Sequence, residues 1–313
     1  MDDAFEIVAW SFRQLVIGRY PHKDHRGKYF PPSSWRGKKA GTEMFCKGAC
    51  LGNTGDWAWL KQVVGLRGWN DGKNRCCCWW CKARFVEGSY DDASLSARWR
   101  TTLLNMTTFW AMMGEEGMFC SKAWSIPGMR LSFMRPDWMH TVDLGITAYL
   151  SGHILFHLFT LLGGKRYGAV TKQNSVCNQI MNMVQIAARH AGCETPEAVL
   201  TLERFRAKKA KPKLKLKAAD SRYYLPALLA TLRLFFSPKS DRDHMMHGCV
   251  AALVDIYAEL DAWDTTTSPP LIAGLARRHI ILYKELHETS PDKDLWALYP
   301  KNIMCSYTFA KIR

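Results

Sequence analysis

A series of five helical segments fills the second half of the chain and constrains its fold more than any other feature. In each segment apolar residues recur at intervals of three and four, the spacing that places them on one face of a helix. Strand signal is weak throughout this half. Helices are therefore expected over residues 138–162, 171–191, 222–236, 243–263 and 270–288.

The first half of the chain mixes strand and helix signals with loop-forming sequence. Residues 1–41 contain a short helical stretch followed by basic sequence rich in proline and glycine, which predicts a basic arm. Residues 42–146 alternate short apolar runs, such as TEMFCKGACLG and MRLSFM, with helical stretches, and this predicts a core of strands and helices. The helical part, 147–313, contains a basic connector over 204–222.

One helical segment resembles a membrane span in composition. ITAYLSGHILFHLFTLL, residues 146–162, is apolar but only 17 residues long, whereas a span needs about 20 apolar residues. It also carries His153 and His157, four positions apart, without the glutamate of an HExxH zinc motif between them. We expect a buried helix whose histidines belong to the core, and no membrane partner.

The charge balance points to a polyanionic partner. The chain has 43 lysine and arginine residues against 28 aspartate and glutamate residues, a net charge of +15. Such a chain gains affinity for nucleic acid through the release of counterions. DNA is the expected partner and an anionic membrane surface ranks second. The alternative is a solvated basic surface with no partner, because net charge bears on solubility as well as on association.

The most compact basic run is KKAKPKLKLK, residues 208–217. It could contact phosphates or act as a nuclear import signal, which gives a nuclear localisation. Two alternatives are an exposed edge strand that lysine protects from pairing and a solvated connector. The candidate nucleic-acid-binding residues are Lys208, Lys209, Lys211, Lys213, Lys215 and Lys217.

Eleven cysteines, and an N-terminus without the pattern of a signal peptide, predict a reducing compartment in which clustered cysteines favour metal over disulfides. The segment CCCWWC contains Cys78 and Cys81 at the spacing of half a zinc site. Cys46 and Cys50 are the nearest second pair. Zinc is therefore a candidate cofactor, and the alternative is that these cysteines pack as small apolar side chains.

Two aspartates are the first candidates for chemistry. Asp56 and Asp137 each stand where a short apolar run gives way to a helical segment, and His140 follows the second at plus three. Carboxylates from neighbouring strands can hold divalent metal ions that polarise a phosphodiester and activate water. Mg²⁺ suits such oxygen ligands. The alternative is that both aspartates are helix N-caps.

The order of these motifs is more specific than any one of them. GDWAWLKQVVGL, then CWWC, then PDWMHTVDLGI resembles the core of cut-and-paste DNA transposases with a ribonuclease H-like fold, above all the CACTA and Plavaka-type branch. The resemblance implies an α/β fold, with a ribonuclease H-like mixed sheet and a large helical insertion. It makes Asp56 and Asp137 ligands of Mg²⁺ or Mn²⁺ in a two-metal site. His140 would brace that site or contact DNA, and Cys78 and Cys81 would be the CxxC motif.

Such transposases complete the site with a glutamate from a helix that follows the insertion. Glu285 and Glu288 in YKELHETS are the candidates within this chain. The segment after them lacks a clear amphipathic pattern, so the glutamate is expected to lie beyond residue 313, as in a C-terminally truncated copy.

The sequence therefore predicts a transposase-derived domain whose ancestral reaction is two-metal cleavage and strand transfer on DNA, with a catalytic site that is incomplete here. A homo-oligomer is compatible with this prediction. The alternative is a non-catalytic protein that binds nucleic acid, or an interaction protein stabilised by zinc. The position of Asp56 relative to Asp137 separates them, because the transposase hypothesis requires both at one sheet edge.

Overall fold

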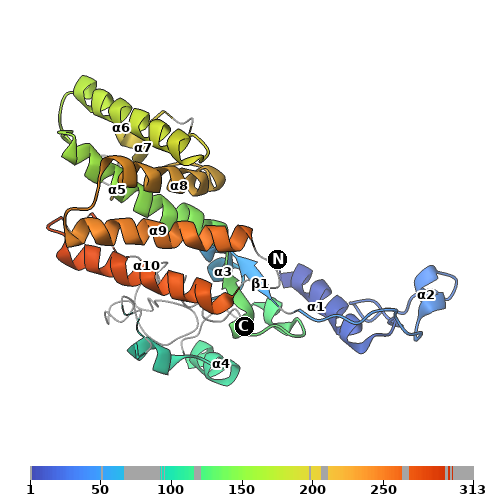
Figure 1. Ribbon diagram of the computed structural model, residues 1–313. Helices are drawn as coiled ribbons and strands as arrows, with labels where there is room; N and C mark the ends of the chain where they lie inside the picture. The colour runs from blue at the N-terminus through green and yellow to red at the C-terminus, as the bar shows by residue number, and fades with distance from the viewer. Residues whose placement is uncertain are drawn as a thin grey trace. The chain divides into compact units, whose positions relative to one another are not determined.

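The structure is a computed structural model that describes residues 2–298, apart from 51, 67–91, 93, 95, 116–120, 197–198, 206–210, 263–267, 293–294 and 297. The chain divides into two compact units, and Figure 1 labels the helices and strands that belong to them. One unit comprises residues 1–89 and 98–137, and we call it the strand unit. The other comprises residues 90–97 and 138–313, and we call it the helical unit.

The helical unit confirms the five predicted helices. Its elements are η7 (Met139–Thr147), α5 (Ala148–Leu161), α6 (Val170–Ala191), α7 (Leu202–Phe205), α8 (Ala218–Phe235), α9 (Asp241–Asp261) and α10 (Pro269–Thr289). Their ends follow local chemistry. Ser240 and Asp243 form a capping box at the start of α9. Gly192, in the left-handed conformation, ends α6. Figure 1 shows α9 and α10 packed side by side.

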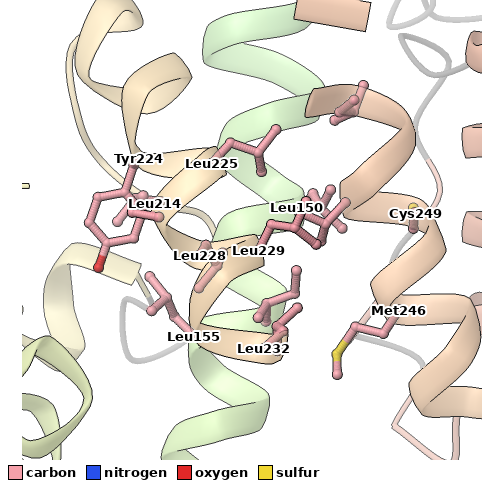
Figure 2. Packing of buried hydrophobic residues seen from close by; sticks show 14 of the residues in the cluster. Leu150, Leu155, Leu214, Tyr224, Leu225, Leu228, Leu229, Leu232, Met246 and Cys249 are labelled. Atoms are coloured by element: carbon pink, nitrogen blue, oxygen red, sulfur yellow. The ribbon is translucent and has the colours of Figure 1, made fainter. Parts of the chain in front are cut away.

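The core of the helical unit draws buried apolar side chains from α5, α6, α8, α9 and α10, and leucines of α5 and α8 lie within it. Each fully buried side chain of this size contributes about 1.5–3 kcal/mol to folding. Figure 2 shows how these side chains meet between the two helices, with Met246 and Cys249 of α9 beside them. The labelled members from α5, α8 and the segment before α8 are Leu150, Leu155, Leu214, Tyr224, Leu225, Leu228, Leu229 and Leu232.

The apolar helix expected to be buried lies in this core. Residues Met139–Leu161 form one continuous helix that is long and apolar enough to cross a membrane, and 67% of its most apolar window is buried inside the protein. His153 is fully buried, and its Nδ1 atom lies 2.9 Å from the hydroxyl of Tyr283 on α10. His157 is partly buried. The interpretation of His153 as a core histidine is confirmed.

Part of the basic run forms an extended segment that crosses α5, and we call residues 211–217 the strap. The backbone N–H of Lys213 donates to the carbonyl of Phe205 at 2.8 Å, and that of Leu214 donates to Ala148 at 2.8 Å. Pro212 and Leu214 are buried, Lys213 between them is partly buried, and Lys211 and Lys215 are exposed. The alternating pattern therefore produces an extended segment, but its backbone partners here lie at helix ends.

A second histidine of the helical unit is buried without charge. His279 on α10 is 2% exposed, and its Nδ1 atom lies 3.0 Å from the carbonyl oxygen of Cys249 on α9. Because that oxygen can only accept, Nδ1 carries the proton and donates it. Burial lowers the pKa of His279 to about 4.

Lowering the pH from 7 to 5 is expected to cost about 2 kcal/mol of the free energy of unfolding through His279. The unfolded chain binds this proton near pH 6.5, the ordinary histidine value, whereas the folded chain does not bind it until about pH 4. The contribution is thus complete above pH 6.5 and is lost as the pH falls toward 4. Urea titrations at both pH values should show a smaller drop for His279→Asn, which keeps a donor but does not titrate. Equal drops in the two proteins would contradict this assignment.

The strand unit contains short elements. They are α1 (Asp2–Ile17), α2 (Trp35–Lys39), β1 (Asn53–Gly55), α3 (Trp57–Gln62), η4 (Arg98–Thr102), α4 (Met106–Glu115), η5 (Lys122–Ser125), η6 (Leu131–Phe133) and β2 (Met134–Pro136). Strands β1 and β2 pair in parallel. A small aromatic core surrounds Trp124, whose ring lies 5.0 Å from that of Phe109 and whose Nε1–H donates to the carbonyl of Val64.

The predicted ribonuclease H-like mixed sheet is wrong. Within the described residues the only sheet is the pair β1–β2, and most of the chain is helical. In the described part of the apolar run TEMFCKGACLG, Glu43 bridges to Arg19 and Phe45 is exposed. In MRLSFM, residues 131–133 form a 3₁₀ turn before β2. These runs are short and end at glycine or proline, which favours turns over long paired strands.

Candidate functional site

The two predicted metal ligands leave neighbouring strands at the same edge. In the β1–β2 register Gly55 lies opposite Pro136, and the N–H of Asp137 donates to the carbonyl of Gly55 at 3.0 Å. Asp56 and Asp137 are therefore the first residues beyond a parallel pair whose strands lie about 4.8 Å apart. Two residues that are 81 positions apart in the chain are brought together by this pairing.

Local packing fixes Asp56 at the start of α3. Its Oδ1 atom accepts a hydrogen bond from the N–H of Trp59 at 2.6 Å, so it is the N-cap of that helix. Glycine before it lets the Trp59 ring pack against the strand, because a Cβ atom at Gly55 would lie 2.5 Å from that ring. The N-cap alternative thus holds for Asp56, and it leaves the carboxylate at the strand edge.

His140 lies three residues after Asp137, on the π-helix η7. Both side chains are partly buried. A π-helix is rare and often marks a functional segment. The sequence could not distinguish it from an α-helix, because both place apolar residues on one face at nearly the same spacing.

The candidate third acids do not form a recognisable metal site. Glu285 and Glu288 are exposed on α10, where Glu288 pairs with Lys284 at 3.6 Å. In the part of the chain that the structure describes, no group of three or more His, Cys, Asp or Glu side chains could hold a metal ion. Cys78 and Cys81 lie outside the described residues, so the zinc hypothesis stays a prediction.

The predicted nucleic-acid-binding lysines have different surroundings. Lys208 and Lys209 lie outside the described residues, and Lys211, Lys215 and Lys217 are exposed on the strap. Lys213 instead lies over the ring of Tyr149 with its Nζ atom 4.9 Å from the ring centroid. Burial lowers the pKa of Lys213. This lysine therefore anchors the strap to α5 and is a poorer candidate for binding phosphate than its exposed neighbours.

A buried polar network at the start of the long helix was missed by sequence reasoning. Asp143 is 9% exposed, and its Oδ1 atom accepts from Trp138 Nε1 at 3.1 Å and from the Tyr257 hydroxyl at 2.5 Å. Thr147 lies 2.9 Å from the same hydroxyl. The sequence signal that could have revealed it is a carboxylate within an apolar helix, because a buried carboxylate needs hydrogen-bond partners.

The second missed feature is the surface built by residues 19–44, which we call the N-terminal module. Its sequence predicts only a basic arm. In the structure it is folded, with antiparallel bridges between Lys23 and Tyr29 and between Arg19 and Glu43. It lines a pocket of about 290 Å³ together with residues of α1, among them Trp10.

Comparisons of this chain with protein families, with curated proteins and with solved structures gave no match.

Proposed function

We propose that this chain is a transposase-derived DNA-binding protein that holds a divalent cation between Asp56 and Asp137. The motif order GDW, CxxC and DxxH supports the transposase origin. The net charge of +15 supports the DNA partner. The ribonuclease H-like sheet is not part of this proposal.

The observation that carries the proposal is the placement of the two aspartates. Asp56 and Asp137 follow the paired residues Gly55 and Pro136 of parallel strands. Aspartates that served only as caps on unrelated helices would have no reason to share a strand edge. Ligand sites in sheets with parallel strands form at this edge, beyond the carboxyl ends of the strands.

The residues fit a single hydrated cation better than a complete two-metal centre. Carboxylate oxygens suit Mg²⁺ or Mn²⁺, and Mg²⁺ commonly uses one or two protein carboxylates while keeping several waters. A bound cation would supply charge neutralisation for a DNA phosphate. The role of Asp56 and Asp137 is to hold it, and the role of the exposed lysines of the strap is to bind phosphates of the DNA.

Phosphodiester cleavage is the second candidate function, and the same strand-edge pair favours it. Cleavage by two metals requires further ligands to fix both ions. Among the described residues no third side chain joins the pair in a metal-binding group. Binding of DNA with a cation, without cleavage, is therefore the function that the geometry supports best.

Replacing either aspartate by asparagine is expected to weaken Mn²⁺ binding at least 10-fold, as measured by the electron paramagnetic resonance of free Mn²⁺. Asparagine removes a charged ligand, yet it caps a helix as well as aspartate does, so Asp56→Asn should keep its fold. Asp220→Asn, an exposed aspartate in the first turn of α8, is the matched control and should bind Mn²⁺ normally. Unchanged Mn²⁺ binding in both strand-edge variants would overturn the proposed site.

The same proteins test cleavage. With Mg²⁺ or Mn²⁺ and supercoiled DNA, we expect retention of the DNA in a mobility-shift assay and no nicking. Nicking that disappears in Asp56→Asn and Asp137→Asn would instead establish the second candidate function. Failure to bind DNA at low salt would contradict the proposal as a whole.

A further inference from the structure

The N-terminal module carries a dense positive charge. It contains seven lysine and arginine residues against two carboxylates. Asp24 accepts hydrogen bonds from the N–H groups of Arg26 and Lys28, both at 2.9 Å, and so closes a hairpin turn. Glu43 pairs with Arg19 at 4.0 Å. The basic side chains, all of them exposed, are Arg19, Lys23, Arg26, Lys28, Arg36, Lys38 and Lys39.

Aromatic rings lie among these charges. Trp35 is 62% exposed and Tyr29 is 67% exposed, although large apolar side chains are normally buried. The Lys23 ammonium lies 4.5 Å from the centroid of Tyr29, and the Arg36 guanidinium lies 5.4 Å from that of Phe30. Cations therefore lie against aromatic rings at two places in this module.

Beside Trp35 the surface is hollowed. The pocket of about 290 Å³ has a mostly aromatic and apolar wall with Arg36 on it, and its size is near the lower end for pockets that bind small molecules, about 300 Å³. The rings of Tyr20 and Trp35 meet in it at 86°, with centroids 5.6 Å apart. The lining residues are Trp10, Tyr20, Phe30, Trp35, Arg36 and Met44, with four smaller contributors.

The exposed rings, the basic side chains and the pocket together favour an unpaired nucleotide as the ligand. Every base has a flat face that can stack on an aromatic ring, and proteins that hold single strands combine such rings with a basic groove. The bases of a duplex are already stacked on each other and present mainly their edges and the phosphates. An acidic peptide could satisfy the charges, but it would have no flat group for the pocket.

We propose that the N-terminal module binds single-stranded nucleic acid, with one unpaired base in the pocket beside Trp35. The flanking phosphates contact the basic side chains of α2 and of the hairpin around Asp24. This inference rests on the proposed function, because it names the form of nucleic acid that the protein holds. It assigns the contact to residues 19–44, a region distinct from the lysine run at 208–217.

The test is the affinity of the full chain for fluorescein-labelled dT12, measured by anisotropy in EDTA over a series of salt concentrations. Parallel arms use rU12, a 12-base-pair duplex and polyglutamate. Trp35→Ala is expected to weaken binding of the single strand roughly 5- to 100-fold, the range for loss of one stacked base. Trp35→Phe, which retains a ring, should recover most of the affinity.

Matched variants separate stacking from charge. Tyr167→Ala removes an aromatic ring of the helical unit that is 80% exposed and lies beside Arg166, and it should leave the affinity unchanged. Replacing Arg36, Lys38 and Lys39 together by glutamine should reduce the slope of log affinity against log salt by about 2. The control with the same net charge replaces Lys165, Lys172 and Arg189, and its slope should stay unchanged.

The binding results either support or overturn the proposed single-strand site. Tighter binding of dT12 or rU12 than of duplex, lost in Trp35→Ala, supports it, and the better of the two arms identifies the sugar. Equal binding of wild type and Trp35→Ala overturns it, as does polyglutamate binding as tight as that of dT12. If duplex DNA binds strongly while Trp35→Ala has no effect, the inference fails and the proposed function stands. Failure to bind any nucleic acid removes both.

Discussion

Replacing Gly152 by valine is expected to lower the free energy of unfolding by roughly 3 kcal/mol or more, the upper range for inserting atoms into a packed site. Gly152 lies within α5 where the strap crosses that helix. A Cβ atom there would lie 2.5 Å from both the Cα and the N of Lys213, and 2.7 Å from the N of Leu214. All three are backbone atoms, so a rotamer change cannot relieve the contact. Urea denaturation measures the loss.

A matched glycine is expected to respond in the opposite direction. Gly274 also lies within a helix, α10, but nothing lies within 4 Å of the position that its Cβ atom would occupy. Gly274→Ala should therefore raise the free energy of unfolding by about 1 kcal/mol, the difference in helix propensity. Gly152→Ala should lower it despite the same gain in propensity. If Gly152→Ala were as stable as Gly274→Ala, the strap would not lie against α5.

Because the valine side chain at position 152 would push against the strap, the strap itself should also lose stability in Gly152→Val. The strap is held by the bonds from Lys213 to Phe205 and from Leu214 to Ala148. Hydrogen exchange of the amides of Lys213 and Leu214 should accelerate more in Gly152→Val than that of the amides of α10. Uniform acceleration across the helical unit would mean that the substitution acts on the whole unit rather than through this crossing.

The helices could be predicted from the sequence because their signal is local. Each carries its own apolar face, and caps such as Ser240 and Gly192 stand beside the residues that they terminate. The sheet could not be predicted in the same way. Strands β1 and β2 have only three residues each, and their pairing joins segments far apart in the chain. The larger sheet was expected only because the motif order resembles that of transposases, and these short strands do not form it.

The candidate site was predictable only in part, and for similar reasons. Asp56 and Asp137 were expected at one strand edge because their motifs occur in a known order, and the structure confirms their adjacency. The pocket beside Trp35 was missed because its walls come from α1, the hairpin and α2. No local pattern reveals that Trp10, Phe30 and Trp35 line one cavity. The role of Asp143 was missed because the sequence shows a carboxylate in an apolar helix but does not show which distant residues donate hydrogen bonds to it.

Asp143→Ala is expected to cost roughly 3–5 kcal/mol of the free energy of unfolding, because two hydrogen bonds to a buried carboxyl group are removed together. Trp138 and Tyr257 both donate to its Oδ1 atom. Asp143→Asn keeps an acceptor oxygen and should lose less. Asp255→Ala, an exposed aspartate on α9, is the control and should stay within about 0.5 kcal/mol of wild type.

A double-mutant cycle with Tyr257→Phe decides whether the network acts as one unit. The Tyr257 hydroxyl lies between Asp143 and Thr147, whereas the guanidinium of Arg222 lies 5.0 Å from the ring centroid, a contact that phenylalanine keeps. The phenylalanine variant alone should cost about 1–2 kcal/mol. If the two side chains interact as the distances indicate, the double variant should lose less free energy of unfolding than the two single variants together. The difference should be about 1–3 kcal/mol. Simple additivity would mean that Asp143 is stabilised by other partners, and that the π-helix does not depend on its contact with α9.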